Sequence, residues 1–291
     1  MTLLYCSVRI SHYLSTSFFL SITHAEHGAA KASSKVAGRE TVEGLIGLGL
    51  SDDSKSLSVV QVASETDFAG RSETFVQLVQ DVTTSVLTQN DYTNAALTTE
   101  QLHALPGVGT NVSSIKDLMD SAIVAIRENI SVPSATKYVA NDPQTFWVPY
   151  VHNKVAGTET GTAVAAVLVG PSADKTVDEE GLRATGKRLA MHIVAAKPQY
   201  LDVQDVPEEA VEKERAVLEG QIELENEASG KAKPPEIVQK MIEGRLRKFY
   251  ELVCLKEQSH MLEEKNPKVS KVLQDAGVEL HQYVYLTIGR A

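Results

Sequence analysis

The sequence predicts an α+β protein of two related halves, each a small antiparallel sheet with packed helices, plus an inserted helical hairpin. Two observations lead to this prediction. A pair of apolar strands followed by an amphipathic helix occurs twice, and two charged helices joined by a short break follow the second copy. With 43% hydrophobic and 23% charged residues, the chain of 291 residues has the composition of a folded protein of one large domain or two modest ones.

Residues 1–28 precede the predicted folded part. The first 25 residues contain no Asp or Glu, several hydroxyl residues and a single Arg. This composition partly matches an organellar presequence, although such segments are usually richer in Arg. A secretory signal and a wrongly assigned first exon are the alternatives. Residues 29–40 begin Ala-rich and predict a short linker helix that ends in a turn at Gly38.

The first half is assigned to residues 41–140. Apolar stretches at 45–50 and 56–64 flank the polar turn Ser51-Asp52-Asp53, which is typical of a β-hairpin. The helix that follows has one apolar stripe at three- and four-residue spacing, formed by Phe75, Leu78, Val79, Val82 and Val86. Residues 91–120 are rich in Thr, Asn and Gly and are interpreted as a spacer that leads into a helix through Leu118 and Ile126.

The second half is assigned to residues 141–291 and repeats this plan. Strands are predicted at 146–152 and 163–170, on either side of a glycine-bearing turn. The helix that follows has its own apolar stripe, formed by Leu182, Leu189, Ala190, Ile193 and Val194. The alternating, β-branched and aromatic residues of 278–289 predict a closing strand that joins the second sheet.

The helical hairpin is assigned to residues 206–255, within the second half. Helices are predicted at about 207–228 and 236–254, and the glycine and prolines between them form the break. Asp205 and Glu208 are expected to cap the first helix. Its many carboxylates are interpreted as a solvated face. Two helices joined by so short a break should pack antiparallel.

Charge and hydropathy limit the classes of partner. The net charge of −10 disfavours direct binding of nucleic acid, because such proteins use excess Lys and Arg to displace counterions from phosphates. No apolar run approaches the roughly 18 residues of a membrane span, so no membrane association is expected. An acidic factor of this kind is expected to bind another protein.

Signatures of enzymes and metal sites are largely missing from the sequence. GVGT at 107–110 lacks the Gly-Lys-Ser/Thr ending of a phosphate-binding loop, and no two of the eight histidines are spaced i, i+4 as metal ligands on a helix. Cys6 and Cys254 are the only cysteines, which excludes a disulfide framework or a multi-cysteine zinc site built from this chain alone. No cofactor is expected.

Two positions remain as candidates for a binding surface. Asp67 and Phe68 lie in the polar joint between the strand that ends near Ser64 and the next helix, where an exposed aromatic could anchor a partner. The alternative is that Phe68 covers its own core and Asp67 caps the helix. His192 lies one residue before Ile193 of the second stripe, so its ring is expected at the surface, beside the stripe.

The segment SETDFAGRSETF, at 64–75, resembles the Thr-Asp-Phe-Val signature of the elongation factor Ts family. Ala69 stands where the family usually has Val, and Gly70 where Ala is common. Three further segments resemble the family in the same order: KASSKVAGRETVEGLIG at 31–47, GKRLAMHIVAAKPQYLDVQDVPEEAVEKER at 186–215 and EIVQKMIEGRLRKFYELVCLKEQ at 236–258. The closing strand also matches, so the resemblance covers roughly residues 29–290 and is closest to mitochondrial forms.

The resemblance implies a partner, elongation factor Tu, in its GDP-bound and nucleotide-free states. It implies that the chain promotes GDP release in organellar protein synthesis without covalent catalysis, and that nucleotide and magnesium belong to the partner. The implied contact residues are Thr66, Asp67, Phe68, Met191 and His192. In the implied mechanism Phe68 inserts between helices of the GTPase domain and displaces groups that support the magnesium ion and the phosphate loop. The helical hairpin is implied to reach another part of the GTPase.

One part of the family's pattern has no counterpart here. The family begins with a three-helix module that also touches the GTPase, and nothing before residue 29 resembles it. A core-only variant or an incorrect first exon would account for this. The mitochondrial matrix is the expected location. A structural or chaperone-like protein that binds elongation factor Tu without exchange activity is the main alternative, and an α+β enzyme with a polar pocket is the third.

Overall fold

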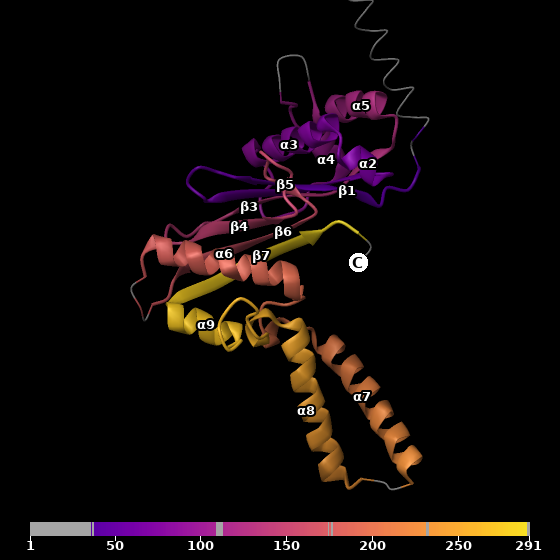
Figure 1. Ribbon diagram of the computed structural model, residues 1–291, viewed down its shortest axis with the longest axis vertical. Helices are drawn as coiled ribbons and strands as arrows, with labels where there is room; N and C mark the ends of the chain where they lie inside the picture. Colours follow the sequence, from indigo (N-terminus) through magenta and orange to yellow (C-terminus); the bar gives the residue numbers. More distant parts are fainter. Residues whose placement is uncertain are drawn as a thin grey trace, which may run out of the picture.

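In the computed structural model, two antiparallel sheets are packed face to face between layers of helices (Figure 1). The structure describes residues 36, 38–108, 113–173, 175, 177–230 and 233–289. Strand order is β3-β2-β1-β5 in the first sheet and β4-β6-β7 in the second. The predicted fold class is confirmed. Residues 1–28 and most of the expected linker helix lie outside the described residues.

The first sheet is built on the predicted hairpin. β1 (Glu43–Leu50) and β2 (Ser56–Ser64) pair antiparallel across the turn at 51–54. On the other side β2 pairs with β3 (Ile130–Val139), a strand that the sequence analysis did not predict. Pro133 interrupts the alternation of β3, and it is tolerated because β3 is an edge strand whose register shifts at this point.

Helices α3 (Glu73–Thr88), α4 (Thr99–Ala104) and α5 (Ile115–Ile126) cover the outer face of this sheet. All five predicted stripe residues of α3 are buried in the core, as expected. The interpretation of residues 91–120 as a spacer is wrong, because Leu102, Ile115 and Met119 are buried in the same core. Their spacing is too irregular for a periodicity argument, and the contacts that bury them come from residues distant in the sequence.

The second sheet consists of β4 (Phe146–His152), β6 (Ala163–Pro171) and β7 (Val278–Thr287). β6 is central and pairs antiparallel with both neighbours, so the closing strand joins this sheet as predicted. Helices α6 (Glu179–Ala196) and α9 (Val269–Ala276) pack on its outer face. The short strand β5 (Thr160–Gly161), between β4 and β6, pairs with β1 and ties the second half to the first sheet.

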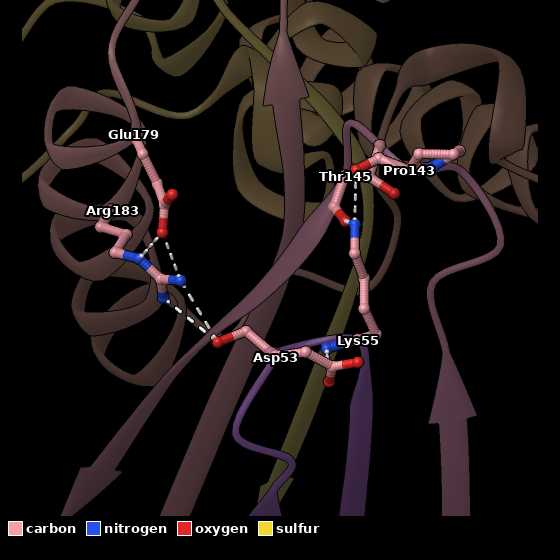
Figure 2. A network of polar contacts seen from close by, with 7 residues as sticks. Asp53, Lys55, Pro143, Thr145, Glu179 and Arg183 are labelled. Carbon is pink, nitrogen blue, oxygen red and sulfur yellow. Dashed lines mark hydrogen bonds and ion pairs between the residues drawn. The ribbon is translucent and has the colours of Figure 1, made fainter.

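The two sheets share an apolar core. It contains Trp147, which is completely buried, together with Ile46, Leu57 and Val164. At one edge a polar network also joins the sheets (Figure 2). There the Lys55 ammonium donates to three backbone carbonyls of residues 142–145, at 2.7 Å for that of Pro143. The relative placement of the halves is therefore fixed by packing and by hydrogen bonds.

Arg183 of α6 belongs to the same edge. Its guanidinium donates to the Ser54 hydroxyl at 3.3 Å and lies 4.5 Å from the centre of the Phe146 ring, within the range of a cation–π contact. Glu179, one turn earlier, forms an ion pair with it at 2.7 Å. The network thus links the first hairpin turn to the helix that carries Met191 and His192.

Helices α7 (Glu208–Ser229) and α8 (Pro235–Val253) form the predicted antiparallel hairpin and project from the body (Figure 1). They are held together by a small core of their own, formed by Leu218, Ile222, Ile242 and Leu246. The expected capping pair is wrong: the N-cap of α7 is Pro207, without a side-chain hydrogen bond. Asp205 instead ends a 3-10 turn, η1 (Val203–Asp205), in which its carboxylate accepts from the Asp202 amide at 3.0 Å.

Candidate partner-binding site

Phe68 projects from a short helix, α2 (Asp67–Gly70), between β2 and α3. Its side chain is 77% exposed, the largest exposed fraction among the big apolar residues that the structure describes. Ala69 and Gly70 are the buried residues of this turn, so Phe68 is on the opposite side and takes no part in the core. Of the two alternatives for Phe68, the structure therefore supports the projecting aromatic.

A network of hydrogen bonds fixes the base of α2. Thr66 caps the helix, and its backbone amide and hydroxyl both donate to the Glu128 carboxylate, at 3.0 and 2.7 Å. The Asn129 amide in turn donates to Glu65 at 2.6 Å. Glu128 follows α5 and is 62 residues from Thr66 in the sequence, so no local pattern could have indicated this contact. The Phe68 ring is thus presented from a rigid joint.

Asp67 does not cap either helix. Thr66 caps α2, and the Ser72 hydroxyl accepts from the Phe75 amide at 3.2 Å to cap α3. The Asp67 carboxylate forms an exposed ion pair with Arg71 at 2.9 Å. An exposed pair of this kind contributes little to stability, so its charges remain available to a partner.

His192 is buried, and the expectation of a surface ring is wrong. It is 1% exposed, and Gln258 and Met261, from the segment between α8 and α9, contact its ring. Nε2 lies 3.1 Å from the Gln258 side-chain oxygen, and Nδ1 accepts from the Met261 amide at 3.3 Å. The spacing of apolar residues within α6 could not indicate this burial, because the segment that contacts His192 follows the helical hairpin in the sequence.

A second buried histidine stacks on His192. The ring centre of His260 lies 5.0 Å away, with 23° between the planes. Burial lowers the pKa of His192, an effect that the hydrogen bond from its Nε2 to the Gln258 side-chain oxygen partly opposes. Burial and the neighbouring His192 lower the pKa of His260 to about 4. Both rings are therefore neutral at pH 7.

Met191 lines a cavity of about 560 Å³ at the end of α6. Met261 and Leu262 line it too, and they are 59% and 48% exposed. A second cavity, of about 620 Å³, is lined by Asp67 and Arg71 beside Phe68. Asn153 and Thr162 line both cavities, so the surface near α2 continues to the end of α6. The structure thus brings Asp67, Met191 and His192 to one connected surface, where His192 lines the cavity although it is only 1% exposed.

An enzymatic interpretation finds little support at this surface. A general base needs a free lone pair, whereas both nitrogens of His192 are engaged. Cys254 is buried, and burial raises the pKa of its thiol to about 11, which disfavours a nucleophilic thiolate. Across the described ranges, His, Cys, Asp and Glu side chains do not gather into a group of three suited to a metal. Nor does any helix in them combine the length and apolar content needed to cross a membrane.

Comparison with known proteins identifies the family. The sequence model of the family described as "Elongation factor TS" matches residues 65–290, from the α2 joint to the closing strand. The chain is 32% identical over 269 residues to elongation factor Ts of Aquifex aeolicus, covering 90% of this chain and 84% of that protein. It is 35% identical over 249 residues to elongation factor Ts of Paramagnetospirillum magneticum, covering 86% and 72%. On this evidence the chain belongs to the elongation factor Ts family.

Proposed function

We propose that the chain is a nucleotide exchange factor that binds elongation factor Tu carrying GDP and promotes GDP release without covalent chemistry. Family membership supports the choice of partner. The observation that carries the proposal is the Phe68 ring, 77% exposed on a joint that Glu128 holds rigid. An aromatic held in this way loses little conformational entropy on binding, as the anchor of an interface should.

In this mechanism Phe68 inserts between helices of the GTPase domain and displaces groups that support the magnesium ion and the phosphate loop. Burying the ring is worth about 1.5–3 kcal/mol, which can offset the cost of distorting the nucleotide site. Coupling is reciprocal, so a factor that weakens GDP binding is itself weakened by nucleotide. The nucleotide-free complex therefore persists until a new nucleotide displaces the factor.

We also propose that the factor acts in the mitochondrial matrix, on mitochondrial elongation factor Tu. The opening 25 residues, free of Asp and Glu, support this location. Isolated mitochondria should take up the full chain and protect it from added protease, whereas a chain starting at residue 29 should stay accessible. Equal protease sensitivity of the two chains would contradict the proposed location and leave the exchange activity untouched.

The test of exchange is release of a fluorescent GDP analogue from elongation factor Tu at fixed magnesium. We expect the wild-type chain to accelerate release, and we expect the acceleration by the Phe68→Ala variant to be at least about tenfold smaller. The free energy of unfolding of this variant should differ from that of the wild type by less than about 0.5 kcal/mol. Tyr92→Ala is the matched control, because it truncates an aromatic residue that is 36% exposed and follows the C-terminal end of α3, away from α2. Binding without acceleration by the wild type would favour the chaperone-like alternative.

A further inference from the structure

The turn of the first hairpin holds the connection between the two sheets. Residues 140–145 lead from β3 of the first sheet to β4 of the second. The Ala140 amide donates to the Lys55 carbonyl at 2.8 Å, and the Trp147 amide, just inside β4, donates to the Ser54 carbonyl at 2.9 Å. Between these ends, the Lys55 ammonium donates to three backbone carbonyls (Figure 2), those of Asp142, Pro143 and Thr145. We call this set of contacts the connector clamp.

Lys55 is itself fixed within the turn. The Asp53 carboxylate accepts from the Ser51 hydroxyl at 2.5 Å and from the Lys55 amide at 3.0 Å. Loss of the Lys55 ammonium would take one donor from each of the three carbonyls, while the backbone hydrogen bonds at both ends of the connection would remain. The clamp can therefore be weakened at its middle by a change of one side chain.

The clamp lies at the opposite end of the first sheet from α2 (Figure 1). The nine residues of β2 separate the two and span about 30 Å. Phe68 belongs to the first half and Met191 to the second, so their relative position depends on the angle between the halves. The apolar core between the sheets is held by non-directional contacts, whereas hydrogen bonds have preferred directions. A rotation of about 6° at the clamp would move a point about 30 Å away by about 3 Å.

We propose that Lys55 is a positioning residue for nucleotide exchange, which locks the angle between the halves while Phe68 enters the partner. This inference rests on the proposed function. Insertion of Phe68 has to distort the nucleotide site of elongation factor Tu. If one half could rotate against the other, the factor would relieve that strain itself and the nucleotide would stay bound. Lys55 therefore acts on the release step and not on docking, as an interaction does that matters only after the complex has formed.

The test is release of a fluorescent GDP analogue from elongation factor Tu, measured over a range of concentrations of the full chain. Lys55→Met keeps the aliphatic stem and should lower the maximal rate about fivefold, with the half-saturating concentration changed by less than about twofold. Lys55→Arg, which has several donors, should recover most of the rate. Arg183→Ala is the matched control and should release GDP like the wild type. Its guanidinium lies at the same edge, but its closest partners, Glu179 and the Phe146 ring, both belong to the second half.

A combination of variants separates positioning from a general loss of stability. In a Phe68→Ala background, Lys55→Met should have almost no further effect on release, because the two residues act through one step. Lys55→Met should also speed hydrogen exchange of the Gln144 and Thr145 amides. With an active wild type, an unchanged maximal rate, an arginine variant as slow as methionine, an additive loss in the double variant or unchanged hydrogen exchange overturns the inference alone. A wild type that does not accelerate release overturns the proposed function as well.

Discussion

Replacing His260 by Phe should remove a pH-dependent loss of stability. His260 is 1% exposed and stacks on His192 at 5.0 Å, and Glu263 and Arg188 are the charged groups nearby. Burial and His192 hold the pKa of His260 at about 4, below its usual value of 6.5. Above pH 6.5 the ring is neutral in both states, so its full contribution to stability is present. Between pH 6.5 and 4 the unfolded chain takes up a proton that the folded protein excludes, and stability falls with pH.

The structure gives the size of this effect. A pKa that drops from 6.5 to about 4 on folding corresponds to about 3 kcal/mol once the pH is below both values. About 2 kcal/mol of that should already be lost at pH 5. The phenylalanine of the His260→Phe variant does not titrate and keeps a ring in the stack. The free energy of unfolding of this variant should therefore fall by about 2 kcal/mol less than that of the wild type between pH 7.5 and pH 5. His192 titrates in both proteins and largely cancels in the comparison.

The assay is urea unfolding of both proteins at pH 7.5 and pH 5, followed by Trp147 fluorescence. Trp147 is the single tryptophan and is completely buried between the two sheets, so it reports on the body of the molecule. The His260→Phe variant lacks the acceptor for the Leu262 amide at both pH values. The stability lost with this hydrogen bond cancels when each protein is compared with itself at the two pH values. Equal losses of stability in the two proteins, or an NMR titration of His260 near pH 6.5 in the folded state, would refute the reasoning.

Three further predictions follow from packing and from the polar contacts. Gly47→Ala should lower the unfolding free energy by about 1–3 kcal/mol in urea titrations, because its Cβ would meet the Thr83 hydroxyl at 2.1 Å; unchanged stability would contradict the close approach of α3 to β1. Glu128→Gln should cost about 1–2 kcal/mol and slow GDP release, because its amide group cannot accept from both donors of Thr66; wild-type exchange rates would show that the α2 joint needs no such support. Arg183→Ala should lower the thermal midpoint by a few degrees through loss of the contact with the Phe146 ring, without a change in exchange; calorimetry and the release assay check both.

The sequence predicted most of the helices and strands whose apolar residues form a clear pattern. The hairpin of β1 and β2 was identified from two apolar runs around a polar turn, the helix α3 from its apolar stripe, and the arms α7 and α8 from the glycine and prolines that separate them. β3 was missed because Pro133 and several small polar residues hide its alternation. The contribution of α4 to the core was missed because Leu102 is buried by residues distant in the sequence.

The candidate site also has features that the sequence indicated and features that only the tertiary structure decided. The sequence by itself determined the family, from the motif at Thr66, Asp67 and Phe68 and the collinear segments that follow it. It could not determine which motif residues are exposed, because exposure depends on chain that returns from far away. Glu128 fixes the Phe68 joint from 62 residues beyond Thr66, and Gln258 covers His192 from 66 residues beyond it. Only the tertiary structure therefore decided that Phe68 projects and that His192 is buried, since burial is a property of packing between segments and not of local spacing.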